Sequence, residues 1–262
     1  MNMPTTPGLL PGESDPRPAK TVAIVQSCYL PWKGYFDLIG SADEFVIYDD
    51  MQYTRRDWRN RNLIKTPQGN SWLTVPVKVK GKYLQAIRET ELDGDSWKSD
   101  HWKSICQNYK RAPHFMQITK ALEPYYLEKP YSHLSQLNRD LTELLCRLLG
   151  IETTLKWSWD YEIGEGKTER LVRICEQAGA TVYLSGPAAR DYIDSTLFDA
   201  AGIGLRYFDY TGYPEYPQLW GEFQHGVSVI DLLFNCGDQA REYMKFPTPS
   251  LHIADTEGDR RP

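Results

Sequence analysis

The largest cluster of cationic side chains lies in the segment DDMQYTRRDWRNRNLIK, residues 49–65. It holds four arginines, one lysine and two asparagines directly after an apolar run, in a chain of formal net charge −5. Guanidinium groups are planar forks that pair with phosphate or carboxylate oxygens. The cluster therefore predicts a site for a nucleotide, a sugar nucleotide or a carboxylate, and a solvated face whose arginines pair with nearby aspartates is the alternative. Its predicted substrate-binding residues are Gln52, Tyr53, Arg55, Arg59, Asn60, Arg61, Asn62 and Lys65.

Several side chains that follow two apolar runs have types that take part in catalysis. Asp49 and Asp50, after the run EFVIY, can bind Mg²⁺ or accept a proton from an amine. Cys28, after TVAIVQ, can act as a nucleophile where a histidine base is within reach, although its sequence neighbours include no histidine. The candidate catalytic residues are Gln26, Cys28, Asp49 and Asp50, and the predicted acceptor site beside Gln26 is completed by Tyr29 and Trp32.

The segment SGPAARDY, residues 185–192, is a second candidate site. A strand that ends in Ser-Gly before a proline and a helix start leaves backbone N–H groups unpaired, and such groups attract anions. Connectors of this kind are also frequent without any ligand, so a purely structural role is the alternative. The predicted substrate-binding residues here are Ser185, Gly186, Arg190 and Tyr192.

Alternating strand and helix patterns predict how these sites are positioned. Short β-branched and aromatic runs predict strands at 21–26, 44–50, 71–80, 153–160, 181–186 and 204–210. Amphipathic segments predict helices between most of them, with an all-helical insertion at about 97–150. The fold class is therefore predicted to be α/β, a mostly parallel Rossmann-like sheet, with a nucleotidyltransferase-like arrangement as one form of it. Ligands of such sheets bind at the carboxyl ends of the strands, where the candidate residues lie.

Length and composition limit the domain organisation and the kinds of protein that this chain can be. The 262 residues, 41% of them hydrophobic, predict a single α/β domain over 21–246, with disordered tails at 1–20 and 247–262. Five widely spaced cysteines without a C-x-x-C pair argue against a zinc or disulfide framework. No signal sequence and no apolar run of membrane-spanning length is found, so a cytoplasmic protein without a membrane partner is expected.

An isoelectric point near 5.6 argues against an extensive nucleic-acid surface. The basic, aromatic-rich cluster is accordingly expected to suit a compact anionic ligand. The consensus motifs of P-loop, dinucleotide-binding, α/β-hydrolase and zincin proteins do not occur. The oligomeric state is left open by the sequence.

Six sequence blocks, in order between about residues 21 and 240, resemble the WbqC-like protein family. They are VAIVQSCYLPWKGYFDLI, ADEFVIYDDMQYTRRDWRNRNLIKT, WLTVPV, the W-x-x-x-H-W-x-x-I-x-x-x-Y stretch from Trp97 to Tyr109, YLSGPAARDYID and VSVIDLLFNCG. The family pattern opens with His-Gln-Pro before Tyr-Leu-Pro-Trp. Here these three positions read Val25, Gln26 and Ser27, so no role of that histidine carries over.

Members of the family occur in gene clusters for surface polysaccharides and natural products, and the name-giving cluster makes a sugar whose amino group carries an acylated glycine. The resemblance therefore implies amide formation on an amine. We expect a transferase or ligase that forms an amide by moving a small acyl or aminoacyl group to a sugar-nucleotide or small-molecule amine. The alternatives are an ATP-dependent nucleotidyl-transfer or adenylating enzyme, by analogy of loop position with pantoate–amine ligases, and a non-enzymatic scaffold. ATP and Mg²⁺ are the candidate cofactors. The donor is left open between a free acid with ATP, a thioester and an aminoacyl-tRNA.

Overall fold

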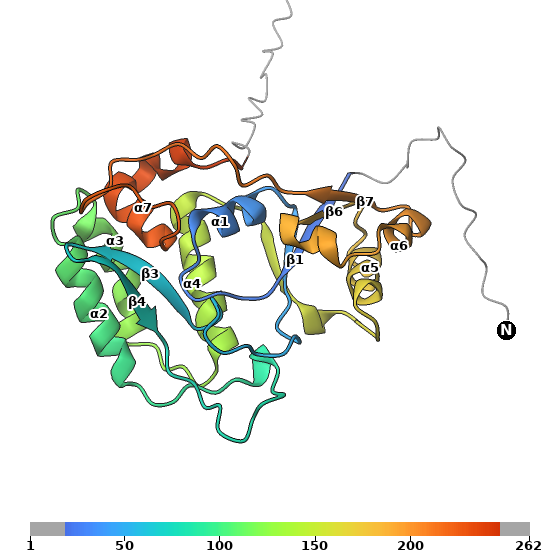
Figure 1. Ribbon diagram of the computed structural model, residues 1–262, viewed down its shortest axis with the longest axis horizontal. Coiled ribbons are helices and arrows are strands. Elements are labelled where there is room, and N and C mark those ends of the chain that lie inside the picture. Colours follow the sequence, from blue (N-terminus) through green and yellow to red (C-terminus); the bar gives the residue numbers. More distant parts are fainter. Residues whose placement is uncertain (1–18, 247–262) are drawn as a thin grey trace, which may run out of the picture.

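A five-stranded parallel sheet forms the centre of the computed structural model, which describes residues 19–246 (Figure 1). The strands stand in the order β5-β2-β1-β6-β7, and each neighbouring pair is parallel. The predicted α/β class with a Rossmann-like sheet is confirmed. The strands are β1 (Thr21–Val25), β2 (Glu44–Ile47), β5 (Thr154–Trp157), β6 (Val182–Ser185) and β7 (Gly204–Tyr207).

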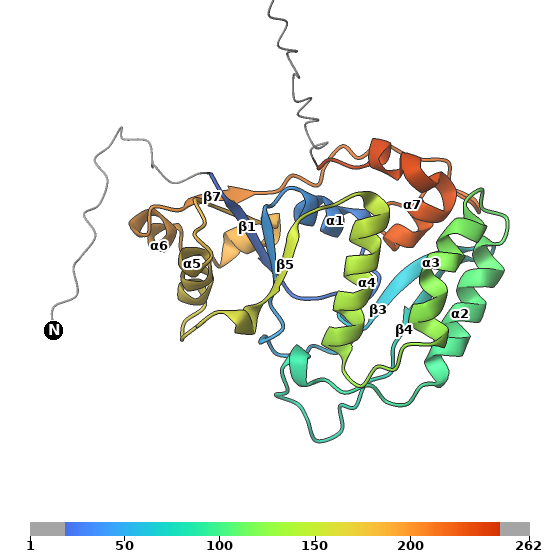
Figure 2. The same ribbon diagram turned by 180° about the vertical axis from the view of Figure 1, so that it is seen from behind.

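Some α-helices cover the faces of this sheet, and helices α2, α3 and α7 lie beyond one side of it (Figure 2). Helix α4 ends at Gly150, whose φ of 65° is the left-handed conformation that a helix-terminating glycine adopts readily. Helix α7 begins at Ser228, whose side chain accepts a hydrogen bond from the amide of Ile230. The helices are α1 (Lys33–Gly40), α2 (Ser96–Tyr109), α3 (Phe115–Leu127), α4 (Leu134–Leu149), α5 (Thr168–Gln177), α6 (Ser195–Ala200) and α7 (Val229–Cys236).

Both faces of the sheet are buried because successive side chains of a strand point to opposite sides. Val22 and Ile24 of β1 pack in one apolar cluster with residues of α5 and α6. Ala23, between them, packs in a second cluster with residues of α1, α4 and α7. Helices α2 and α3 contribute to that second cluster too. The predicted helical insertion thus shares its core with the sheet.

An antiparallel hairpin precedes the helical region, and it differs from the sequence prediction. The strand predicted over 71–80 is shorter, β4 (Gly69–Thr74), and its partner β3 (Arg61–Thr66) was not predicted. Its polar residues hide the strand pattern from the sequence, although Asn62 and Ile64 alternate inward in the structure. The turn TPQG joins the two strands, with Gly69 at a φ of 106°.

The connections that follow the neighbouring strands β1 and β6 lead to opposite sides of the sheet. After β1 the chain crosses the face covered by α1 to reach β2, whereas after β6 it crosses the opposite face through α6 to reach β7. The connections therefore diverge beyond the carboxyl ends of these two neighbouring strands. This divergence makes a crevice in which open α/β sheets bind their ligands.

The predicted tails lie almost entirely outside the described residues. Within residues 19–246, no helix combines the length and the apolar composition needed to cross a membrane.

Candidate ligand-binding cavity at the carboxyl ends of the strands

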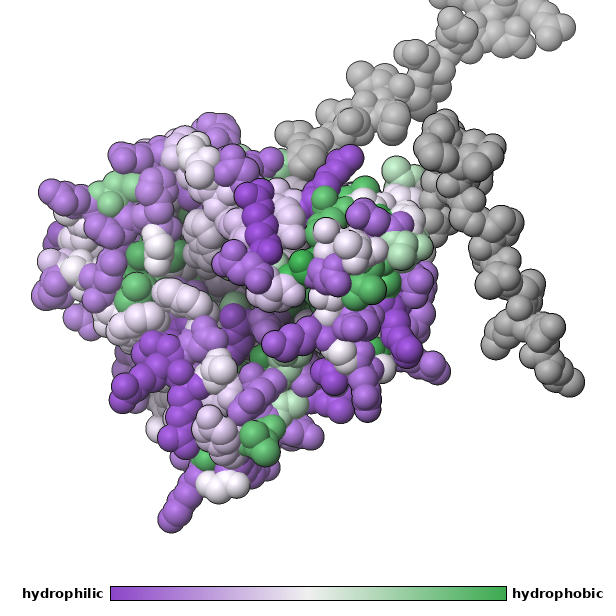
Figure 3. Space-filling model, turned by 45° about the vertical axis from the view of Figure 1, so that its right-hand side comes forward, coloured by the Kyte–Doolittle hydropathy of each residue, from purple (hydrophilic) through white to green (hydrophobic). Residues whose placement is uncertain are grey.

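A cavity of about 970 Å³ opens at the crevice between β1 and β6. Most of its polar wall comes from the loop after β1, the loop before β3, the start of α5 and the segment after β6. Residues of β1, of α1 and of the segments after β2 and β7 complete the lining. The face drawn in Figure 3 is hollowed near its centre. A cavity of this size is large enough for a nucleotide or a ligand of similar size.

The charge of the cavity wall is entirely positive. Arg59, Lys167 and Arg170 line it, and none of its lining residues is an aspartate or glutamate. A lining without carboxylates is notable in a chain with a net charge of −5. Three cations in a lining without carboxylates make the cavity attractive to a phosphate or carboxylate group.

Arg59 is a largely buried cation of the wall, with only 12% of its side chain exposed. Its Nη1 donates to the carbonyl oxygen of Ser27 at 3.1 Å and to Oε1 of Gln26 at 3.4 Å. Its Nε lies 3.6 Å from Oδ2 of Asp57. The Nη2 group makes no hydrogen bond within residues 19–246 and is left to donate to a ligand.

The start of α5 supplies the other two cations. Lys167 directly precedes the helix, and Arg170 is in its first turn, where it donates from Nε to the carbonyl oxygen of Gly164 at 3.1 Å. Arg170 also lies beside the Tyr48 hydroxyl, and it counteracts the rise in the pKa of Tyr48 that burial causes. The N–H groups of a first helical turn lack intrahelical partners, so they add to the positive potential here.

Aromatic rings make up much of the remaining wall. Trp32 lies against Tyr210, with ring centroids 5.2 Å apart, and Trp58 stands at the cavity with 44% of its surface exposed. Such rings offer flat apolar surfaces on which a base or a sugar can stack. The aromatic residues of the lining are Trp32, Tyr35, Tyr48, Trp58, Tyr183, Tyr192 and Tyr210.

The structure brings eight of the predicted site residues to the cavity. They come from all three sequence segments that were singled out, which meet although they are up to 166 positions apart. Val25, in the place of the family histidine, also lines the cavity. The predicted residues of the lining are Gln26, Cys28, Trp32, Arg59, Asn62, Ser185, Gly186 and Tyr192.

Asp49 and Asp50 do not line the cavity, and their side chains have separate partners. Asp49 is fully buried, and its two oxygens accept from the amide of Ser27 at 2.8 Å and from the hydroxyl of Ser135 at 2.5 Å. Asp50 pairs with Arg88 at 2.6 Å and accepts from Ser158. All four carboxylate oxygens are thus engaged, so this pair does not fit a shared Mg²⁺ ion.

No other metal-binding group replaces them in the part of the chain that is described. Three or more histidine, cysteine, aspartate or glutamate side chains nowhere converge there.

The other eight predicted residues also point elsewhere. Tyr29 is buried, with its hydroxyl oxygen 2.8 Å from Nδ1 of His101, and Lys65 donates to Oε1 of Gln218 at 2.9 Å. Arg190 lies over the ring of Tyr207, 4.8 Å from its centroid. The remaining five contact the hairpin or the loop that follows it. These five are Gln52, Tyr53, Arg55, Asn60 and Arg61.

Sequence reasoning missed the cations at the start of α5. The signal was present, because GEGKTER follows a predicted strand and opens a predicted helix, which is where anions bind. Tyr48 was missed as well, because it sits inside the run that predicted β2. Both positions satisfy the rule that ligands contact the ends of parallel strands.

Cys28 lines the cavity as a protonated thiol. Burial raises its pKa to about 11, and the nearby Arg59 guanidinium only partly counteracts this rise. The thiolate is the nucleophilic form of cysteine, so Cys28 is expected to react slowly at neutral pH. Iodoacetamide applied to the native protein at pH 7 should modify the half-buried Cys106 before Cys28. Peptide mass spectrometry measures the order, and faster modification of Cys28 would indicate an activated nucleophile instead.

Comparison with known proteins places the chain in one family without giving an activity. The family model described as the WbqC-like protein family matches residues 26–243. The uncharacterized protein Rv1507c of Mycobacterium tuberculosis (strain ATCC 25618 / H37Rv) is 56% identical over 227 residues, which cover 87% of this chain and 98% of that protein. No solved structure matches the chain. The expected resemblance is thereby confirmed, and the chain belongs to the WbqC-like protein family.

Proposed function

We propose that this protein is a transferase or ligase that joins a small acyl or aminoacyl group to the amine of an anionic, nucleotide-like acceptor. The lining of the cavity carries this proposal. It combines three cations, seven aromatic rings and no carboxylate at the divergence of β1 and β6. Such a lining is complementary to a ligand with a phosphate at one end and a planar ring or sugar at the other.

The residues of the cavity divide between the two parts of such a ligand. Lys167 and Arg170, with the N-terminal amides of α5, hold the phosphates. Trp32 and Tyr210 stack against the ring or sugar. Arg59, which comes from the loop before β3, holds the second anionic group or the developing charge of the acyl carbonyl through its unpaired Nη2.

In this scheme most of the rate enhancement comes from holding the two substrates in the correct relative position. The Cys28 thiol is protonated at neutral pH, so the scheme contains no acyl-thioester intermediate on Cys28. Holding amine and acyl carbon in contact converts a bimolecular reaction into an effectively intramolecular one. The apolar residues Ile24 and Leu38 of the lining help to exclude water from the bound acyl group.

Two linked measurements test the proposal. Sugar nucleotides and nucleoside phosphates should raise the melting temperature of the protein, while the matching nucleosides without phosphate should raise it much less. Amino-sugar nucleotides that bind are then incubated with acyl donors, and mass spectrometry detects an amide product. If millimolar phosphorylated ligands leave the melting temperature unchanged, the assignment of the cavity is wrong.

A second candidate is the adenylating or nucleotidyl-transfer reaction. The start of α5 favours it, because Gly166 and Lys167 precede a helix N-terminus at the cavity, and this arrangement suits a polyphosphate. Pyrophosphate release from Mg-ATP in the presence of an acid and an amine separates the two candidates. Amide formation from a preformed thioester or ester without pyrophosphate release supports the first candidate alone.

A further inference from the structure

The positive charge of the chain is concentrated in one stretch of 38 residues, 51–88. That stretch holds nine lysines and arginines and a single acid, Asp57, whereas the whole chain has a net charge of −5. The basic cluster before β3 is only the first half of it. The nine cations are Arg55, Arg56, Arg59, Arg61, Lys65, Lys78, Lys80, Lys82 and Arg88.

Folding brings the two halves of this stretch together on one surface. Arg55 donates to the carbonyl oxygen of Val79 at 3.3 Å, and Gln52 donates to that of Tyr83 at 2.9 Å. The loop after β4, which projects at the bottom of Figure 1, therefore lies against the segment before β3. We call the result the hairpin surface. It consists of the exposed or half-exposed side chains of Arg55, Arg56, Trp58, Arg61, Trp72, Lys80 and Tyr83.

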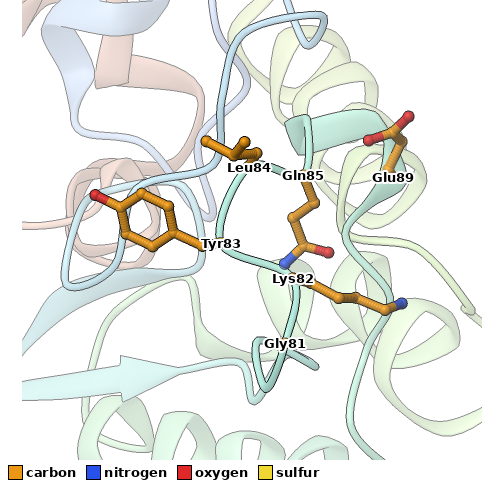
Figure 4. Close-up of a pocket in the computed structure, with 6 residues that line it drawn as sticks. All are labelled: Gly81, Lys82, Tyr83, Leu84, Gln85 and Glu89. Atoms are coloured by element: carbon orange, nitrogen blue, oxygen red, sulfur yellow. The ribbon is translucent and has the colours of Figure 1, made fainter.

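Three of the exposed aromatic side chains of the structure belong to the hairpin surface. Trp58 and Trp72 are each 44% exposed, and their ring centroids lie 5.4 Å apart. The Arg61 guanidinium lies over the Trp72 ring, 4.1 Å from its centroid. Tyr83 is 80% exposed, and Figure 4 shows it pointing to one side of its loop while Lys82 points to the other. The surface therefore presents flat π systems among cations.

Some of the nearby cations already have partners and do not count as free charge. Lys78 and Lys82 both pair with Glu91 at 2.7 Å, and Arg88 pairs with Asp50. No carboxylate of residues 19–246 forms a salt bridge with the four cations of the hairpin surface, although Arg61 lies near enough to Asp57 to help lower the pKa of that carboxyl. These four are Arg55, Arg56, Arg61 and Lys80.

The hairpin surface begins at the rim of the cavity. Trp58 belongs to both, and its neighbour Arg59 is a largely buried cation of the cavity wall. Asn62, next to Arg61 on β3, also lines the cavity. A polyanion that lay on this surface would therefore end at the cavity mouth.

We propose that the hairpin surface binds a single-stranded segment of RNA. Single strands are bound by grooves that combine cations for the phosphates with aromatic rings on which bases stack in turn. The guanidinium stacked on Trp72 adds the cation–π arrangement found at such sites. An acidic protein would satisfy the charges, yet it would leave the exposed indole faces without planar partners. A duplex would likewise offer no unstacked bases to Trp58 and Trp72.

If the proposed function is correct, an RNA site beside the cavity also identifies the acyl donor as an aminoacylated RNA. An aminoacylated RNA that lay on the hairpin surface would present its acylated 3′ end at the cavity mouth. The amine of the ligand in the cavity would attack the ester carbonyl, forming the amide and breaking the ester bond. The 3′-terminal oxygen would leave and take up the proton that the amine releases.

Binding of a short RNA tests the surface without any reaction. Fluorescence anisotropy of a labelled, unacylated 12-nucleotide single strand is measured with the full chain at low salt. Binding should weaken steeply as salt rises. Trp72→Ala should weaken it about 5- to 150-fold, the loss expected for one stacked base. Trp159→Ala, which removes an exposed tryptophan outside the surface, should leave the affinity unchanged.

Three outcomes overturn the proposal. One is equal binding of polyglutamate of matched charge, which would indicate an acidic protein partner. Another is equal binding of a duplex of the same length, and the third is unchanged affinity in a folded Trp72→Ala variant whose melting temperature matches the wild type. A labelled DNA strand of the same sequence distinguishes RNA from DNA. These outcomes leave the response of the cavity to sugar nucleotides intact, so they are separable from failure of the proposed function.

Discussion

Replacement of Arg59 by alanine is expected to weaken binding of an anionic ligand to the cavity by about 1.5–3 kcal/mol, or about 10- to 150-fold. Only 12% of the Arg59 side chain is exposed, so its hydrogen bond to a ligand is poorly screened by water. Arg59→Lys should recover only part of the loss, because an ammonium group retains the charge but lacks the planar fork. Isothermal titration calorimetry with the best ligand of the thermal-shift screen measures the difference.

Arg190 provides the matched control for this change. It was predicted as a site residue from the sequence, but the structure places it over Tyr207 and outside the lining. Arg190→Ala should therefore leave the affinity within about twofold of the wild type, a change well below 1 kcal/mol. Arg59 also holds the loop after β1 through Ser27, so the melting temperature of each variant must be compared. Equal losses in both variants would show that charge around the cavity, and not the Arg59 contact, determines affinity.

Replacement of Asp231 by alanine is expected to lower the free energy of unfolding by about 2–5 kcal/mol, since each buried group left without a partner costs about 1–3 kcal/mol. Asp231 is fully buried on α7 and accepts from Tyr109 and Tyr216, both at 2.8 Å, and from Gln218 at 2.7 Å. These donors come from α2 and from the loop before α7, so the carboxylate ties three parts of the fold together. Urea unfolding of the variant measures the loss.

Asp199→Ala is the control, because this exposed aspartate of α6 makes no hydrogen bond from its side chain to other described residues. It should change the free energy of unfolding by less than about 0.5 kcal/mol. An equally small effect of Asp231→Ala would mean that the two tyrosine hydroxyls find other partners.

The Asp231→Asn variant separates the charge from the hydrogen bonds. Burial raises the pKa of Asp231, and the bonds from Gln218, Tyr216 and Tyr109 only partly offset this. The folded protein therefore holds this proton at pH values where the unfolded chain, with a carboxyl pKa near 3.9, has lost it. The contribution of Asp231 to stability is complete below that pH and falls as pH rises through the folded pKa. Urea unfolding at several pH values should show a smaller fall above pH 4 for Asp231→Asn.

Much of the sheet could be read from the sequence. The runs TVAIVQ, EFVIY and TVYLSG became β1, β2 and β6, because short β-branched segments between turn signals have few alternatives to a buried strand. The position of the site followed from the same patterns, since parallel strands bring their carboxyl ends to one edge. Strand β3 could not be predicted, because Arg61 and Lys65 hide the alternation of apolar and polar residues along it. This strand also depends on its pairing with β4.

Only the tertiary structure decided which cation of the basic cluster serves the cavity. Arg59 and Arg61 are two positions apart, yet one reaches the cavity wall and the other lies over Trp72 on the outer surface. Contacts between distant segments made that division, among them Arg59 with the loop after β1 and Arg55 with the loop after β4. The sequence by itself determined the parallel sheet, the family and the edge of the sheet at which the cavity lies, because these depend on local patterns of residue type. The assignment of each side chain to the cavity, the core or the hairpin surface required the fold, because it depends on packing between segments that are far apart in the chain.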